Sequence, residues 1–257
     1  SANQILPVVN LSNPLNTITG NPDLEPTKSN NFYLGYNNYD YATRSGFYLY
    51  SGATFYNNQI VSSTIFDDSA KRTTTFENTG ATYNGYFGMS LDKSIKKEEH
   101  TFKYSIGISS DFRLSKGLTN NEKYEAESVS FSPNIELSWE YGELLTISPS
   151  YNYNYSNTNF KNYAIDKLSN YVHNLKLATT TYWPKHFVFG NDFGYTYNSN
   201  IADGFKKDFY LWNMSLGYNF FGDKLLAKVK VYDLLDQNVN ATRTITPTAI
   251  QDIENTV

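Results

Sequence analysis

The feature that most constrains this chain is a long alternation of apolar and polar residues between positions 128 and 156. One parity is apolar or aromatic on two successive arms: Val129, Phe131, Pro133, Ile135, Leu137, Trp139 and Tyr141, then Leu145, Ile147, Pro149, Tyr151, Tyr153 and Tyr155. A helix would mix the two parities, whereas a β-strand places them on opposite faces. Each arm is about twice the roughly 5–6 residues of a usual globular strand. This length, with one apolar and one polar face, is typical of a transmembrane β-strand.

Parity within this segment also fixes the turn. Because the apolar residues are odd-numbered on both arms, the connecting loop must hold an odd number of residues. We therefore predict that Tyr141 faces Leu145 around residues 142–144. In this register Pro133 and Pro149 lie in mid-strand on the apolar face, where each removes a ladder donor. We predict bulges or irregular pairing at both prolines.

Composition limits the class of protein. The chain has 257 residues, of which 17% are aromatic, including 23 tyrosines, and 18% are charged, with a net charge of −4. This balance does not suggest a nucleic-acid partner, which would need a basic patch. There is no cysteine, so disulfides and thiolate sites are excluded. The chain contains no run of about 18 apolar residues, so the sequence predicts no transmembrane helix.

The same alternation extends over most of the chain. It predicts about ten strands, at residues 30–39, 46–61, 74–91, 100–114, 128–141, 145–156, 171–181, 187–197, 209–221 and 225–231. Short turns lie near residues 42, 96, 143, 185 and 222, the last a two-residue turn at Gly222 and Asp223, and longer loops lie near 67, 121, 163 and 203. Outer-membrane barrels alternate short periplasmic turns with long outer loops in this way. The sequence therefore predicts an all-β, antiparallel transmembrane β-barrel of meander topology.

Aromatic residues gather next to the short turns. They are Trp139, Tyr141, Tyr182, Trp183, Phe220 and Phe221. This is where an interfacial aromatic girdle of a barrel is expected. The alternative is that these side chains form the core of a soluble β fold.

Two stretches resemble the C-terminal half of TonB-dependent outer-membrane receptors. The first stretch is residues 20–26 (GNPDLEP), followed by Leu34, Gly35 and Tyr36. It is similar to the segment that leads into a barrel strand in these receptors. Thr27 departs from the pattern, because an acidic residue is usual at this position. Residues 225–238 (LLAKVKVYDLLDQN) are similar to the penultimate strand of the family, in the version of the broad outer-membrane β-barrel branch that includes SusC-like transporters.

The resemblance implies a C-terminal portion, residues 1–257, of a plugged barrel with about 22 strands in the outer membrane of a Gram-negative bacterium. On this interpretation residues 1–27 form an extracellular loop, residues 30–235 form the strands, and residues 236–257 form an extracellular loop before a last strand. Ten strands can also close a small barrel of their own. The implied partners are outer-membrane lipid, the TonB complex through an N-terminal plug, and a surface lipoprotein lid.

Residues for catalysis or cofactor binding do not form a recognisable pattern. His100, His173 and His186 lack metal-ligand spacing. Asp67 and Asp68 are expected to form a solvated loop pair, and no nucleophile, phosphate or calcium motif is found. We therefore expect no enzyme activity, no cofactor and no metal site.

Three classes of function remain compatible with the sequence. The first is TonB-dependent uptake of a nutrient such as a metal chelate, glycan, cobalamin or peptide. The others are a passive porin or structural barrel, and a soluble carbohydrate-binding β-sandwich. For uptake, the candidate ligand contacts are the aromatic residues of the outer loops: Phe66, Tyr124, Phe160, Tyr163 and Phe205. The alternative is that these aromatic side chains only pack loop on loop.

Overall fold

The computed structural model describes residues 2–7, 9–10, 15–67, 71–222, 224–237, 239–246 and 250–256. Its elements are α1 (Ala2–Ile5), β1 (Val9–Asn10), β2 (Asn16–Thr19), β3 (Lys28–Asp40), β4 (Ser45–Asn57), β5 (Ile60–Phe66), β6 (Arg72–Asn78), β7 (Thr82–Lys97), β8 (His100–Thr119), β9 (Glu122–Tyr141), β10 (Leu145–Lys161), β11 (Lys167–Thr181), β12 (Phe187–Asn198), β13 (Asp208–Phe220), β14 (Leu225–Val231), β15 (Val239–Ile245) and β16 (Ile250–Thr256). No helix among the described residues is long and apolar enough to cross a membrane.

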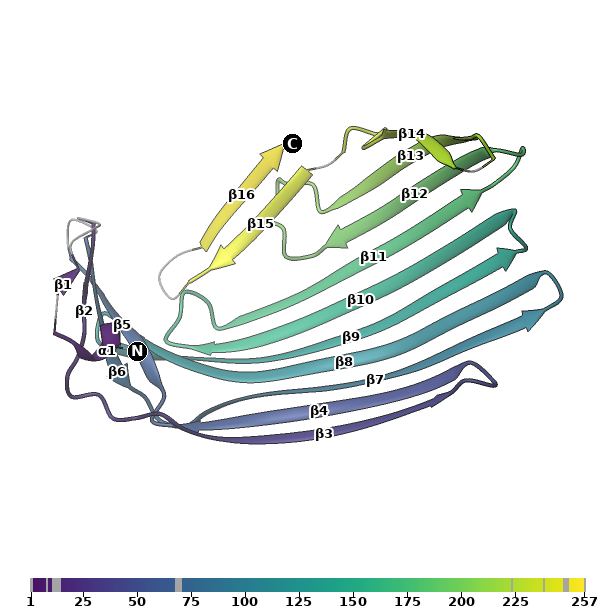
Figure 1. Cartoon of the computed structure of the whole chain (residues 1–257). Coiled ribbons are helices and arrows are strands. Elements are labelled where there is room, and N and C mark those ends of the chain that lie inside the picture. Colours follow the sequence, from purple (N-terminus) through teal and green to yellow (C-terminus); the bar gives the residue numbers. More distant parts are fainter. Residues whose placement is uncertain are drawn as a thin grey trace.

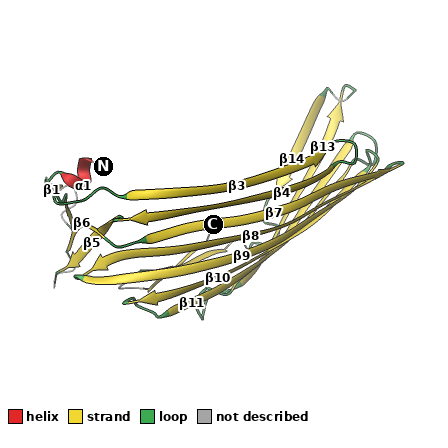
Figure 2. Ribbon diagram, turned by 90° about the horizontal axis from the view of Figure 1, so that it is seen from below, coloured by secondary structure: helices red, strands yellow, loops and turns green. Residues whose placement is uncertain are grey.

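Ten strands, β3, β4 and β7 to β14, form the wall of the molecule. Each pairs antiparallel with the next in chain order, apart from the β5–β6 hairpin inserted between β4 and β7 (Figure 1). The predicted antiparallel meander is confirmed, but two predicted strands are wrong in extent: residues 46–61 include β4 and the start of β5, and residues 74–91 include the end of β6 and most of β7. Seen from below, the wall is a curved, open sheet (Figure 2). Among the described residues, β3 pairs only with β4 and β14 only with β13, so the sheet does not close on itself.

The hairpin of β9 and β10 has the predicted register. Tyr141 pairs with Leu145, and Gly142 in the intervening turn has a φ of 50°. The β9–β10 ladder is interrupted twice, at the positions of Pro149 and Pro133, and resumes each time without a change of register. The irregular pairing is thus confirmed, while the bulges are not found.

Side chains bridge both interruptions on the polar side. Ser148 Oγ donates to Ser138 Oγ at 3.0 Å beside the first, and Asn154 Nδ2 donates to Ser132 Oγ at 2.5 Å beside the second. Each proline keeps its place in the ladder on its other side, because the β8–β9 and β10–β11 pairings are continuous. Polar side chains therefore restore the cross-strand bonds that proline cannot make.

The wall has two chemically distinct faces, which we call the outer and inner faces. The outer face carries the apolar parity, and its residues are well exposed; Met89 is 41%, Leu91 44% and Ile106 48% exposed. On the inner face, Ser90 and Asp92 of the same strand β7 are half-buried. Because the side chains of the polar inner face are less exposed than those of the outer face, we assign the inner face to the concave side of the curved sheet.

Burial in this protein excludes a soluble core. Only Leu118, Ile201 and Ala202 are buried apolar residues in the described part of the chain. A soluble sandwich would bury its large apolar side chains between two stacked sheets, but here they remain on one open face. The β-sandwich alternative is therefore wrong.

Aromatic residues mark both margins of the apolar outer face. At the turn end, Trp139 lies parallel to His100, with ring centres 5.9 Å apart, and its Nε1 donates to His100 Nδ1 at 3.1 Å. At the opposite end, which the sequence pattern did not indicate, tyrosines of β10 to β12 surround His173; Tyr171 and Tyr197 stack at 5.7 Å. At roughly 3.4 Å per residue and a tilt of about 40°, the outer face from Val129 to Tyr141 spans about 30 Å, enough for the apolar band and its aromatic margins.

The strands extend beyond this band, which corrects the predicted loop near residue 121. Residues 115–127 belong to β8 and β9 except for a two-residue turn, Asn120 and Asn121, with φ values of 51° and 64°. Positive φ at both positions defines the type I′ turn that suits a twisted hairpin. The loop predicted near residue 67 is likewise shorter than expected, because β5 and β6 pair up to Phe66 and Arg72; residues 68–70 lie outside the described residues.

Both ends of the chain hold more regular structure than predicted. Residues 1–27 include α1, β1 and β2, and β2 pairs parallel with β6. The C-terminal region holds the separate β15–β16 hairpin. The ladder between β13 and β14 ends at Phe220 and Leu225, so their connection is longer than the predicted two-residue turn; Asp223 lies outside the described residues.

Candidate functional site

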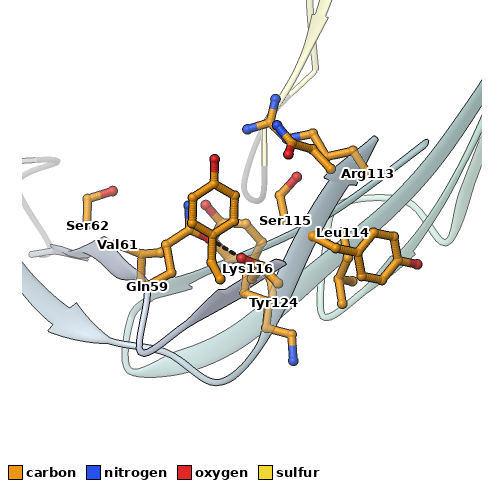
Figure 3. A pocket seen from close by; sticks show the side chains of 12 residues that line it. Gln59, Val61, Ser62, Arg113, Leu114, Ser115, Lys116 and Tyr124 are labelled. Atoms are coloured by element: carbon orange, nitrogen blue, oxygen red, sulfur yellow. Dashed lines mark hydrogen bonds between the residues drawn. The ribbon is translucent and has the colours of Figure 1, made fainter. Parts of the chain in front are cut away.

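The outer end of the inner face carries a polar hollow of about 310 Å³. It lies where the β5–β6 hairpin meets the wall, and Figure 3 shows side chains of the β5 segment across from those of β8. Its lining includes Tyr56, Gln59, Asn84, Arg113, Ser115 and Tyr124. Gln59 accepts a hydrogen bond from Thr82 Oγ1, which ties the start of β5 to β7. The hollow is thus bounded by five strands and lined mostly by hydrogen-bonding groups.

A second hollow, of about 460 Å³, adjoins the first along the inner face. Asn84 and Arg113 line both, so the two form one polar surface. The second hollow adds Thr54, Tyr86, Asp111, Ser128, Ser130 and Ser156. It is nearer the membrane, and it continues the polar surface down the inside of the wall.

Cross-strand pairing aligns Arg113 with uncharged polar residues. Asn84 is its direct neighbour on β7 and Ser128 its neighbour on β9. The row continues to Thr54 on β4, which pairs with Asn84 and donates from Oγ1 to Asn31 Oδ1 at 2.8 Å. Strand pairing therefore sets one guanidinium in the middle of a row of hydroxyl and amide groups.

The acidic residue nearest in sequence to Arg113 on this face is engaged elsewhere. Asp111 Oδ2 accepts a hydrogen bond from Ser130 Oγ at 3.2 Å. Arg113 is exposed, and its guanidinium makes no hydrogen bond or ion pair with the described residues. Lys116 has the opposite parity and pairs with Glu125 on the outer face. Arg113 is therefore an available cation for a group that approaches the inner face.

Three of the five predicted ligand contacts come together beside the first hollow. Tyr163 stacks on Phe160 with ring centres 4.4 Å apart and meets Tyr124 edge-on at 5.4 Å. Tyr163 OH also donates to the carbonyl of Ile245 at 3.5 Å, and burial together with the nearby Tyr124 raises the pKa of Tyr163. Tyr124 itself lines the hollow. This aromatic cluster is one side of the candidate site.

The other two predicted contacts lie apart from the cluster. Phe66 ends β5, 39% exposed, and its N–H donates to Asn120 Oδ1 at 2.9 Å. Phe205 lies in the connection between β12 and β13, where its N–H donates to the carbonyl of Ala202 at 3.2 Å. Arg113 and Asn84 were not among the residues predicted from the sequence, because only aromatic residues of the outer loops were considered. The parity of β7 and β8, which puts both on the polar face, was the signal that could have found them.

An ion-pair ladder supports the outer end of this region. The two carboxylate oxygens of Glu125 lie 3.0 Å from Lys116 Nζ and 3.0 Å from Lys161 Nζ, which joins β8, β9 and β10 on the outer face. Hydrogen bonds from Lys161 and then from Lys116 hold the pKa of Glu125 below its ordinary value. Charged residues at this level also show that the outer face has left the lipid.

We expect this ladder to weaken in acid. Because the folded pKa of Glu125 is lowered, its contacts stabilise the hairpin end above the ordinary glutamate pKa of about 4.3 and are lost as pH falls through the lower folded value. Amide exchange in residues 116–125 should therefore be slower in wild type than in Glu125→Gln at neutral pH, and the difference should disappear as pH falls through the lowered folded pKa of Glu125. Glu122→Gln, at the same hairpin end, should match wild type throughout. A difference that persists unchanged in acid would contradict this assignment.

No group of three or more His, Cys, Asp or Glu side chains in the described part of the chain could hold a metal ion. The chemistry of the site is thus that of binding through hydrogen bonds, the guanidinium of Arg113, the ammonium of Lys116 that is paired with Glu125, and aromatic rings. Its position, on the polar concave side of a sheet whose convex side is apolar, is that of the interior of a barrel.

The curved sheet, its apolar outer face and its polar inner face define the wall of a membrane-spanning β-barrel. A family model described as the outer membrane protein beta-barrel family matches residues 1–140, and the chain belongs to this family. The protein is accordingly located in the outer membrane of Gram-negative bacteria. Comparison with curated proteins finds no match, and neither does comparison with solved structures.

Proposed function

We propose that this chain is part of the wall of an outer-membrane transport protein that takes up a nutrient through a plugged barrel with energy from the TonB complex. The observation that carries the proposal is the polar inner face, which holds hollows at its outer end and a further groove of about 560 Å³ toward the short turns. A ligand that entered from outside would meet hydrogen-bonding groups along its whole path.

Polar groups line the groove near the turns as well. Asp92, Glu136 and Lys176 lie along it, and Lys103 pairs there with Glu140. Charges of both signs suit a passage for polar molecules rather than a lipid-filled space. The dependence on TonB is supported by the resemblance of residues 20–26 and 225–238 to TonB-dependent receptors of the SusC-like branch.

The proposed transport protein has three partners besides its ligand. The outer face would contact outer-membrane lipid, a plug would occupy the interior and bind the TonB complex, and a surface lipoprotein could cover the outer opening. The transported ligand would be a metal chelate, glycan, cobalamin or peptide, held in part by Tyr124, Phe160 and Tyr163. We propose no catalytic role and no cofactor.

Conductance distinguishes this proposal from a passive porin or structural barrel. We expect the intact protein, inserted in a planar lipid bilayer bathed in KCl, to show no stable open-channel steps, because a plug blocks the passage. A general porin from the same membrane serves as the conducting control. Stable, voltage-independent steps would favour the passive alternative and would contradict uptake through a plugged barrel.

A further inference from the structure

The row of residues around Arg113 has a composition that selects a class of ligand. In cross-strand order it runs Asn31, Thr54, Asn84, Arg113, Ser128 and Thr158. Five members are neutral hydrogen-bonding side chains and one is a guanidinium. Such a surface complements a molecule with many hydroxyl groups and one negative charge.

The charge of that ligand follows from the surroundings of Arg113. A guanidinium presents a planar fork that matches a carboxylate or a phosphate. Lys116 also lines the first hollow, but its Nζ lies 3.0 Å from Glu125, so Arg113 is the cation of the lining that has no ion-pair partner among the described residues. Asp111 lies two residues away on the same inner face, about 7 Å along the strand, and would repel a doubly charged group more than a singly charged one. A carboxylate therefore fits better than a phosphate dianion.

The remaining groups favour hydroxyls over an apolar body. Ser128 and Asn84 flank Arg113 in register, and Gln59 and Ser115 line the adjoining hollow. The ring of Tyr124 closes the side nearest the aromatic cluster. Sugar rings combine hydroxyl edges with C–H faces that can lie on such an aromatic ring.

We infer that Arg113 anchors the carboxylate of a sugar acid in the double hollow on the inner face. Asn84, Ser128 and Ser115 would bind its hydroxyl groups, and Tyr124 would contact the ring. This inference names the ligand class for the proposed uptake and rests on that proposal for its biological meaning.

Galacturonate and galactose form a matched pair of probes, because they differ in a carboxylate at one carbon. Saturation-transfer NMR on the intact protein in detergent should detect galacturonate bound at least about tenfold more tightly than galactose, given the strength of charge-assisted hydrogen bonds. Inorganic phosphate, as the dianion probe, should compete weakly. Absence of galacturonate binding, or equal binding of the two sugars, would overturn the inference.

Variants of the site sharpen the test. Arg113→Gln should weaken galacturonate about tenfold and leave galactose unchanged, and Arg113→Lys should show an intermediate loss because the charge remains but the fork is gone. Asp111→Asn should strengthen galacturonate a few-fold, since it removes a repulsive charge. Lys230→Gln, which removes a cation on the polar parity of β14 opposite Ser215, is the control and should have no effect.

Two outcomes would identify another role for Arg113. If Lys230→Gln weakens galacturonate as much as Arg113→Gln, the attraction is a diffuse electrostatic field and not a site. If Arg113→Gln lowers the melting temperature and leaves galacturonate binding intact, Arg113 is an internal ion-pair partner. This binding assay is independent of the conductance test, so stable channel steps would overturn TonB-dependent uptake without affecting the carboxylate site.

Discussion

Ile106→Arg is expected to lower the free energy of unfolding of the membrane-inserted wall by about 2–4 kcal/mol, the cost of a cation on the lipid face of a barrel near the bilayer midplane. Ile106 is 48% exposed on the outer face of β8, and its cross-strand partners are Leu91 and Ile135. It lies near the centre of the apolar band, so a guanidinium there has the longest way to reach either aqueous margin. Denaturant titration of the intact protein folded into lipid vesicles measures the loss.

The neighbouring residue supplies the matched control. Ser105 is on the inner face, and its cross-strand partners are Asp92 and Glu136. Ser105→Arg therefore adds the same side chain one residue away, between two carboxylates and facing water, and should change the free energy of unfolding by less than about 1 kcal/mol. Equal destabilisation by the two variants would show that the outer face is not in contact with lipid, and would remove the basis of the two-faced wall.

The sequence was informative wherever one side of a strand contacts lipid and the other contacts water. This contrast produced the alternation that predicted the turn at 142–144, the register of β9 and β10, and the disturbance at Pro133 and Pro149. Above the membrane both sides of a strand meet water, so the alternation disappears although the backbone ladder continues. Residues 115–127 were predicted as a loop for this reason.

The same limit explains the outcome for the candidate site. Aromatic side chains in polar segments are conspicuous, and Tyr124, Phe160 and Tyr163 do cluster. Arg113 could be recognised as a candidate ligand contact only once its cross-strand neighbours were known. Whether a single cation can bind a ligand depends on the residues beside it, and strand pairing brings those from β7 and β9. Pairing between distant segments, such as β5 with β8, could not be derived from local periodicity.

Residues 20–26 form hydrogen bonds that hold the segment before β3 in place. Asn21 Nδ2 donates to the carbonyl of Phe76 at 2.9 Å, and Glu25 receives a hydrogen bond from Asn58 Nδ2 at 2.7 Å. The amide of Glu25 donates to Asn78 Oδ1 at 2.8 Å. The motif therefore fastens the segment before β3 to the β5–β6 hairpin, which in turn borders the first hollow.

Replacing Gly20 by alanine should disrupt this fastening. A Cβ built at Gly20 would lie 2.1 Å from the carbonyl oxygen and 2.8 Å from the carbonyl carbon of Leu6. These are backbone atoms that cannot rotate away, so the segment of residues 2–7 must move, and the hydrogen bond from the Asn21 N–H to the Gln4 carbonyl, 2.7 Å long, should break. We expect a loss of roughly 1–3 kcal/mol, typical of an overpacked contact.

Gly80 provides the control for this substitution. It is exposed between β6 and β7, and a Cβ there would meet only Lys116 Nζ, at 3.9 Å, so Gly80→Ala should leave stability unchanged or raise it by up to about 1 kcal/mol. Hydrogen exchange of the Asn21 amide should accelerate in Gly20→Ala and not in Gly80→Ala, and proteolysis within residues 2–7 should follow the same order. Because the contact is with backbone, Gly20→Ser should behave like Gly20→Ala. If Gly20→Ala instead behaves like Gly80→Ala, the approach of Leu6 does not fix the motif, and its glycine must be explained by the strand that follows.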